Sequence, residues 1–199
     1  MIRAVVFDIG RVLVDWQPEA FYDRRIGTER REALFRETAI LEMNTRIDAG
    51  EPAFEVTREH AGRHPAWRDE IHAWHDDWED TLAGPVPGTA DLLMALKARG
   101  VPVLALSNFG ADTILRARRL HPVLDAFDRA FISGELRLMK PDPAIYAHVE
   151  AETGLPPKTL FFTDDSPVNV AAARERGWQA HLFEDAPGLE RELGRLGLL

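Results

Sequence analysis

Ile2-Arg-Ala-Val-Val-Phe-Asp8-Ile-Gly10 is a short apolar run that ends in an aspartate and a glycine. Branched and aromatic residues are typical of a buried β-strand, and the polar residue and glycine that follow are typical of a loop. The same design recurs at residues 101–106 before Ser107-Asn108, and at residues 159–163 before Asp164-Asp165. The sequence therefore predicts three buried strands that end in polar residues.

Helical stretches separate these strands. Leucines at helical spacing predict a helix over 90–99, which Gly100 ends, and another is expected over 168–176. A final amphipathic helix is expected over 189–199. Alternating strands and helices predict an α/β fold, a Rossmann-like doubly wound parallel sheet with helices on both faces. Ligands of such sheets bind beyond the carboxyl ends of the strands, where the polar residues fall.

Residues 15–84 differ from the rest of the chain, because they hold no strand-like run and are rich in Glu, Arg, Ala and aromatic residues. Ile71, Trp74 and Trp78 recur at spacings typical of one helix face. The Gly84-Pro-Val-Pro-Gly88 segment then breaks the helical pattern. We expect residues 15–84 to form a small, wholly helical cap, inserted into an α/β core made of residues 1–14 and 85–199.

The composition restricts the class of protein. A net charge of -9 repels phosphate backbones, so nucleic acid is not an expected partner. The absence of cysteine excludes thiol chemistry and fits a reducing compartment, and no apolar stretch is long enough to cross a bilayer. The expectation is a cytoplasmic monomer or homodimer that acts on a small molecule away from membranes.

Four elements offer chemistry. The carboxylate of Asp8, exposed at the end of a strand, can serve as a nucleophile, although such residues are often simple turn or helix caps. Ser107-Asn108 offers a hydroxyl and an amide for an anion, and a helix expected just beyond would add its amides, although both residues are also common helix caps. Lys140, in a loop before a proline, can balance negative charge. Adjacent acids such as Asp164-Asp165 repel each other unless a cation joins them, and Mg²⁺ suits oxygen ligands of this kind.

In this order the elements resemble the haloacid dehalogenase superfamily. The resemblance spans nearly the whole chain, through Phe7-Asp-Ile-Gly-Arg-Val-Leu13, Leu106-Ser-Asn108, Met139-Lys-Pro-Asp-Pro143 and Phe162-Thr-Asp-Asp-Ser-Pro-Val-Asn169. It implies that Asp8 is the nucleophile, that Ser107 and Asn108 bind the transferring group, and that Lys140 supports the charges.

The same resemblance implies a metal site. Mg²⁺ would be held chiefly by Asp165, with Asp164 nearby, together with Asp8 and the backbone carbonyl of Gly10. The implied reaction is hydrolysis of a phosphoric monoester, a small phosphorylated metabolite, through an aspartyl-phosphate.

Gly10 departs from the usual phosphatase pattern, which has a second aspartate two residues after the nucleophile to exchange protons with the leaving group and water. A branch that hydrolyses sugar phosphates, including glucose-1-phosphate phosphatases, has a similar Asp-x-Gly-x-Val opening. Asp15 or an acid of the cap is a possible substitute, although Asp15 is more simply a helix cap.

Two other functions remain open. A 2-haloacid dehalogenase uses the same nucleophile without a metal, but Asp164-Asp165 would repel a carboxylate substrate and invites Mg²⁺ instead. A non-catalytic binding or regulatory protein on the same fold is the other alternative. In the cap, residues 42–50 are expected over the pocket, so Asn44 and Arg46 are candidate substrate contacts.

Overall fold

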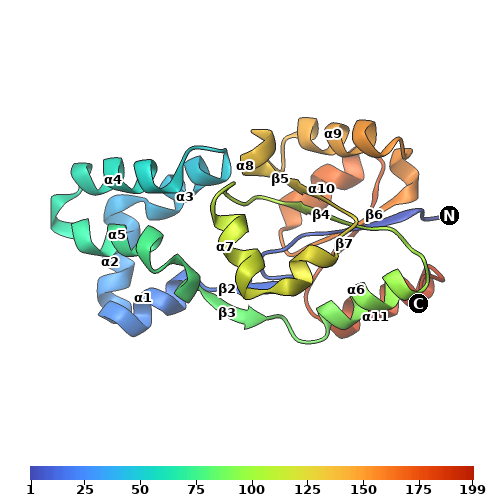
Figure 1. Cartoon of the computed structure of the whole chain (residues 1–199), viewed down its shortest axis with the longest axis horizontal. Helices are drawn as coiled ribbons and strands as arrows, with labels where there is room; N and C mark the ends of the chain where they lie inside the picture. Colours follow the sequence, from blue (N-terminus) through green and yellow to red (C-terminus); the bar gives the residue numbers. More distant parts are fainter.

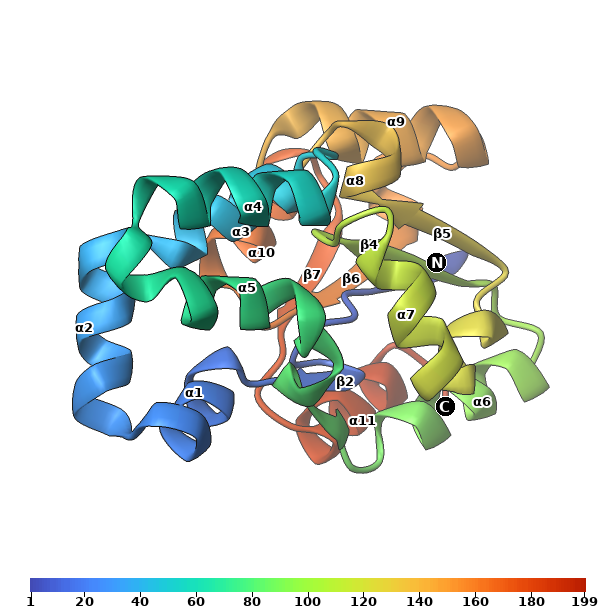
Figure 2. The same cartoon turned by 60° about the vertical axis from the view of Figure 1, so that its left-hand side comes forward.

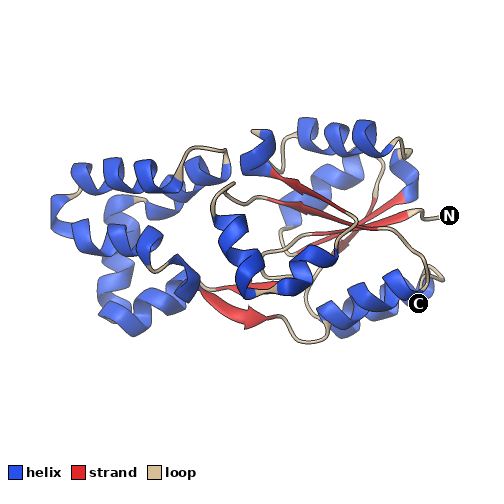
Figure 3. Cartoon of the chain, in the orientation of Figure 1, coloured by secondary structure: helices blue, strands red, loops and turns tan.

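A computed structural model describes the whole chain, residues 1–199. Its centre is a sheet of five strands in the order β5-β4-β1-β6-β7, and every neighbouring pair is parallel. The strands are β1 (Ala4–Phe7), β4 (Val103–Ser107), β5 (Arg129–Ile132), β6 (Leu160–Asp164) and β7 (Gln179–Leu182). Figures 1 and 3 show this sheet at the centre of the larger body. The predicted α/β fold with a parallel sheet is therefore confirmed.

Helices cover both faces of the sheet, because successive residues of the buried strands point to opposite sides. Val5 and Phe7 of β1 belong to one apolar cluster, while Ala4 and Val6 belong to another. The first cluster packs under α6 (Thr89–Ala98), α7 (Thr113–Leu120) and α11 (Ala186–Arg195). The second packs under α9 (Pro143–Thr153) and α10 (Pro167–Glu175), and α8 (Ser133–Leu136) follows β5.

The register of the central strands positions the site. Phe7, the last residue of β1, lies opposite Ala105 on one side and Thr163 on the other. Because all three strands run in the same direction, the residues that follow them meet at one edge of the sheet. Asp8 therefore lies between the ends of β4 and β6.

A second, smaller body is built from five helices with a core of their own. These are α1 (Pro18–Ile26), α2 (Thr28–Thr38), α3 (Ile40–Asp48), α4 (Ala53–Arg63) and α5 (Arg68–Asp76). Tyr22, Met43 and Trp74 are among its fully buried side chains, and Trp74 has the packing role typical of an aromatic residue at helical spacing. Figures 1 and 2 show this helical body, hereafter the cap, beside the carboxyl edge of the sheet.

The expectation that residues 15–84 are wholly helical is wrong at both ends. β2 (Val14–Trp16) and β3 (Leu82–Pro85) pair as an antiparallel ribbon where the chain enters and leaves the cap. Backbone hydrogen bonds from Gln17 to Thr81 and from Val86 to Leu13 extend the pairing. Each strand is too short to show an alternating pattern, and only the meeting of the two crossings creates the ribbon. No helix in the structure combines the length and the hydropathy that crossing a bilayer requires.

Candidate active site

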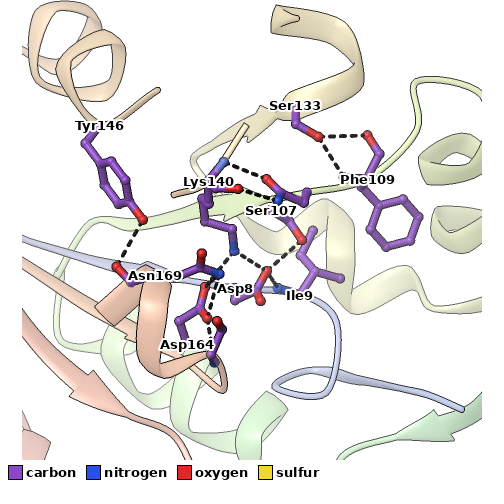
Figure 4. A network of polar contacts seen from close by, with 11 residues as sticks. Asp8, Ile9, Ser107, Phe109, Ser133, Lys140, Tyr146, Asp164 and Asn169 are labelled. Carbon is purple, nitrogen blue, oxygen red and sulfur yellow. Dashed lines mark hydrogen bonds and ion pairs between the residues drawn. The ribbon is translucent and has the colours of Figure 1, made fainter. Parts of the chain in front are cut away.

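Asp8 is held by three donors on a single carboxylate oxygen. Its Oδ1 accepts hydrogen bonds from the backbone N–H of Ile9 and the hydroxyl of Ser107, each at 2.7 Å, and lies 2.9 Å from the Nζ of Lys140. Figure 4 shows these contacts converging at the end of β1. No donor contacts Oδ2, so this oxygen is available to attack a bound electrophile.

Lys140 joins two buried carboxylates. Its Nζ lies 2.9 Å from Asp8 Oδ1 and 2.6 Å from Asp164 Oδ2, and the residue is only 3% exposed. Burial opposes the charge of Lys140, but the two carboxylates raise its pKa above the usual lysine value. The ammonium is therefore a permanent positive charge beside the nucleophile.

The loop that carries Lys140 is fixed by Asn108. The side-chain Nδ2 of Asn108 donates to the carbonyl of Lys140, and the N–H of Lys140 donates to Oδ1 of Asn108, both at 2.8 Å. Ser107 and Asn108, expected to bind the transferring group, thus already contact Asp8 and the Lys140 backbone.

Asp164 and Asp165 have different surroundings although they are adjacent. Asp164 is fully buried and accepts hydrogen bonds from Lys140, the Ser166 N–H and the Asn169 amide. Asp165 is half-buried, and no other side chain donates to its carboxylate. Asp165 therefore keeps its oxygens free for a ligand, whereas Asp164 is a structural anchor.

These acids form a set that fits a divalent cation. One carboxylate oxygen from each of Asp8, Asp164 and Asp165 lies within 4.8 Å of the others. The carbonyl of Gly10, which follows Asp8, accepts no hydrogen bond within the protein. Asp8, Asp165 and the Gly10 carbonyl therefore form an all-oxygen donor set of the kind that suits Mg²⁺, and Asp164 adds negative charge beside them.

The pKa values show that the site is short of positive charge. Burial raises the pKa of Asp8 to about 7 even though Lys140 opposes the rise, and Asp164 adds to it. Burial and the neighbouring Asp164 also raise the pKa of Asp165. One ammonium does not balance three carboxylates, and a further cation would favour their ionised forms.

A hollow between the core and the cap opens beside this cluster. Its lining is formed by residues from both bodies, namely Gly10, Trp16, Asn44, Asp48, Trp78, Asn108, Phe109 and Thr113. The lining contains no lysine or arginine, and three of its members are aromatic. A substrate reaching Asp8 from the cap side would therefore contact apolar rings, neutral amides and the carboxyl group of Asp48.

A family model for haloacid dehalogenase-like hydrolases matches residues 2–177. The chain belongs to this family. As a haloacid dehalogenase-like hydrolase it is an enzyme, and the resemblance seen in its sequence motifs is confirmed.

The relatives of this hydrolase carry the names of two kinds of enzyme, phosphatases and dehalogenases. It is 32% identical over 105 residues to a sesquiterpene phosphatase of Aspergillus oryzae, covering 53% of this chain and 54% of that protein. It is 30% identical over 130 residues to an (S)-2-haloacid dehalogenase of Pseudomonas fluorescens, covering 65% of this chain and 56% of that protein. The matches thus span little more than half the length of these curated relatives.

The fold has solved counterparts. A haloacid dehalogenase family enzyme from Bacteroides thetaiotaomicron, crystallised with magnesium and inorganic phosphate, superimposes with a TM-score of 0.70 at 24% identity, covering 93% of this chain and 96% of that one. This likeness shows that the two chains share a fold.

The helix expected just beyond Ser107-Asn108 begins later than predicted. α7 starts at Thr113, and the N–H of Thr113 donates to the side chain of Asp112. The intervening loop is instead tied to α8, because the Phe109 N–H donates to Ser133 Oγ and the Phe109 carbonyl accepts from the Gly134 N–H. Figure 4 shows this tie beside the site.

The two cap residues proposed from the sequence have different positions. Asn44 lines the hollow, where its side chain contacts Asp48. Arg46 lies outside the lining, and its guanidinium pairs with Glu51 and Glu59. Asp15, the possible proton carrier, lies in β2 and accepts a hydrogen bond from Gln17, so it caps no helix.

Sequence reasoning missed Asp48. It falls within the 42–50 segment, but nothing in its spacing separates it from the other acids of the cap. Burial raises the pKa of Asp48 to about 7, and the nearby Asp8 carboxylate adds to the rise while Lys140 opposes it. A carboxyl group with this pKa beside a hydrolase nucleophile is a candidate for proton transfer.

Proposed function

We propose that the protein is a Mg²⁺-dependent phosphoric monoester hydrolase that acts on a small phosphorylated metabolite through an aspartyl-phosphate. The observation that carries this proposal is the convergence of Asp8, Asp164 and Asp165 within 4.8 Å around one edge of the sheet. Two of the three acids are almost fully buried, and a single ammonium is present to balance them. Such a cluster suits a cation and an anionic phosphoryl group.

The covalent step of the reaction is carried out by a side chain of the protein, the carboxylate of Asp8. Oδ2 of Asp8 attacks phosphorus, so that an acyl-phosphate bond forms as the bond from phosphorus to the leaving oxygen breaks. The Ile9 N–H and the Ser107 hydroxyl hold Oδ1, and Oδ2 is left without a donor. In the second step water attacks phosphorus, inorganic phosphate leaves, and the Asp8 carboxylate is restored.

Lys140 provides positive charge beside the nucleophile. Its ammonium stays fixed between Asp8 and Asp164 by the Asn108 clamp, where it offsets the charge that the incoming phosphoryl group adds. Asp165, Asp8 and the Gly10 carbonyl are the groups that would hold Mg²⁺, with Asp164 close by. Bound there, the ion would supply charge stabilisation and orient the phosphate. A related fold crystallised with magnesium and inorganic phosphate supports this assignment.

The competing function is that of a 2-haloacid dehalogenase. The similarity to the Pseudomonas fluorescens enzyme is the observation in its favour. A haloacid carries its own carboxylate, which the acidic cluster would repel, whereas a phosphoryl group can be bound through Mg²⁺ held by the same acids. The hollow is lined by no lysine or arginine, and Lys140 is already shared by two carboxylates. The charges of the site therefore favour phosphate transfer.

One pair of assays separates the two functions. Hydrolysis of p-nitrophenyl phosphate should require Mg²⁺, stop on addition of EDTA, and return when excess Mg²⁺ is added. Chloride release from 2-chloropropionate should stay at background under both conditions. Metal-independent chloride release without phosphate-ester hydrolysis would replace the proposed function with the dehalogenase.

A further inference from the structure

Gly10 lies two residues after the nucleophile Asp8 and has no side chain, so this position offers no acid. An alkoxide leaving group needs a proton as it departs, and help of this kind typically changes a rate by ~10²–10⁴. Asp164 cannot supply it, because Lys140, Ser166 and Asn169 occupy its oxygens. Asp165 is assigned to the metal, so the candidate source of the proton is another residue that reaches the hollow.

Asp48 is the single acidic residue in the lining of the hollow, which it shares with Gly10 and Asn108. It forms no ion pair, in contrast to the neighbouring Arg46, whose charge is taken by two glutamates. The backbone of Gly110 also lies against its carboxyl group. Asp48 thus lies on the cap side of the hollow, near enough to Asp8 for the two carboxyl groups to repel each other.

A hydrogen-bond chain orients this carboxyl group. The indole Nε1 of Trp74 donates to Asn44 Oδ1 at 3.1 Å, and Asn44 Nδ2 donates to Asp48 Oδ2 at 2.9 Å. Because an indole N–H can only donate, it determines which way the Asn44 amide faces. Oδ2 of Asp48 is therefore an acceptor from Asn44, and a proton on the carboxyl group belongs on Oδ1.

The end of α3, which carries Asp48, is fastened to the core. Ser133 Oγ donates to the carbonyl of Asp48 at 2.6 Å. Two residues later Gly50 has φ +100°, and a Cβ there would lie 2.6 Å from the carbonyl oxygen of Gly134. Figures 1 and 2 show α3 reaching α8 at this point. Only glycine permits this approach, which sets the position of Asp48 relative to Asp8.

We propose that Asp48 of the cap is the general acid and base of the reaction, in place of the acid missing at Gly10. The inference rests on the proposed function. Asp48 donates its Oδ1 proton to the leaving oxygen as the bond to phosphorus breaks. The resulting carboxylate then accepts a proton from the water that attacks the aspartyl-phosphate. Inorganic phosphate and the Asp8 carboxylate are released, and Asp48 is protonated again.

The test is the dependence of kcat/KM on leaving-group pKa, measured with Mg²⁺ across aryl and alkyl phosphates. Asp48→Asn keeps the size of the side chain and its contact with Asn44 but cannot transfer the proton. It should lower kcat/KM for alkyl phosphates by ~10²–10³ and that for p-nitrophenyl phosphate by less than about tenfold, because p-nitrophenolate leaves without a proton. The plot of log kcat/KM against leaving-group pKa should therefore have a steeper slope for Asp48→Asn than for the wild type.

The second step gives an independent readout. With its base removed, Asp48→Asn should hydrolyse the aspartyl-phosphate slowly and show a burst of p-nitrophenol before a lower steady rate. Trp74→Phe removes the donor that orients Asn44, together with part of a buried ring, and should give the same signature at smaller size in protein whose thermal unfolding shows that the cap is folded. Asp15→Asn makes the same chemical change at a carboxylate outside the hollow and should match the wild type.

The outcomes separate the two proposals. An equal loss on aryl and alkyl esters in Asp48→Asn, or an unchanged slope, overturns the role of Asp48 while phosphatase activity stands. A wild type that hydrolyses none of the series with Mg²⁺ overturns the proposed function, and the assignment of Asp48 falls with it.

Discussion

The side-chain amide of Asn108 and the peptide of Lys140 pair through two hydrogen bonds of 2.8 Å, one in each direction. Asn108 follows β4 and Lys140 precedes α9, so this pair joins two loops that are 32 residues apart in the chain. The amide of Asn108 uses both its donor and its acceptor to hold the Lys140 backbone. In this position the Nζ of Lys140 contacts Asp8 and Asp164.

Asn108→Ala should therefore impair catalysis by misplacing Lys140. We expect kcat/KM to fall by ~10–100-fold, since a displacement of about 1 Å in a positioned group has effects of this size. The loss of two hydrogen bonds should lower the melting temperature by only a few degrees, which thermal unfolding would measure. Full activity in this variant would contradict the positioning role.

Asp8→Asn should abolish turnover and leave the protein folded. The amide can still accept hydrogen bonds from Ile9 and Ser107, but it is no nucleophile. The melting temperature should change little, because burial disfavours the Asp8 carboxylate and Lys140 keeps its ion pair with Asp164. Beryllofluoride should bind the wild type far better than the variant. Retention of more than a few per cent of activity would place the nucleophile elsewhere.

Asp165→Asn and Asp164→Asn should differ although the residues are neighbours. Asp165→Asn should raise the Mg²⁺ concentration for half-maximal activity by about tenfold or more, with little change in stability. Asp164→Asn breaks a buried ion pair with Lys140 and should cost about 3 kcal/mol of stability. Thermal unfolding in EDTA and Mg²⁺ titration of activity would check both, and equal destabilisation would contradict the distinction.

Asp48→Asn should change how stability depends on pH in metal-free protein. The pKa of Asp48 rises from 3.8 to about 7 on folding, so the folded state binds the extra proton between these values. The stability that this proton contributes is complete at low pH and is lost as the pH rises toward 7. The asparagine has no proton to lose.

The melting temperature of Asp48→Asn relative to the wild type should therefore increase from pH 5 to pH 7.5, by roughly 3–8 °C, and then level off. Asp15→Asn should show a constant offset over the same range. A relative melting temperature that stays constant or falls as the pH rises would show that folding leaves the pKa of Asp48 unraised.

Gly10→Asp should partly replace the function of Asp48. Nothing lies within 4 Å of a Cβ built at Gly10, so the side chain has room. In the Asp48→Asn background the added acid should raise activity on alkyl phosphates and flatten the dependence on leaving-group pKa. Gly10→Asn is the matched control and should do neither. Equal activity of the two double variants would show that position 10 cannot deliver a proton.

The sequence was sufficient for the parts of the fold that lie in buried parallel strands. A strand covered on both faces is a continuous apolar run, and a polar residue at its end is visible without any knowledge of its neighbours. Asp8, Ser107 and Asp164 follow or close such runs, and parallel strands bring their ends to one edge. Lys140 was recognised by its motif, and the structure places it among them.

The edge strands β5 and β7 were not predicted. β7 reads Gln-Ala-His-Leu, and its residues are half-buried or exposed, so it has no apolar run. Such a segment becomes a strand because β6 offers it a row of unpaired backbone groups. The β2–β3 ribbon also depends on tertiary structure, since Val14 and Pro85 are far apart in sequence and pair because the chain enters and leaves the cap at the same place.

Only the tertiary structure decided which cap residues serve the site. Asn44, Arg46 and Asp48 lie within one helical segment and differ little as a sequence pattern. The approach of Gly50 to Gly134 sets how α3 meets the core, and that contact directs Asp48 into the hollow while Arg46 pairs with glutamates outside it. Local sequence determines the helix and its buried face, but the direction of each polar side chain depends on a docking contact between segments more than 80 residues apart.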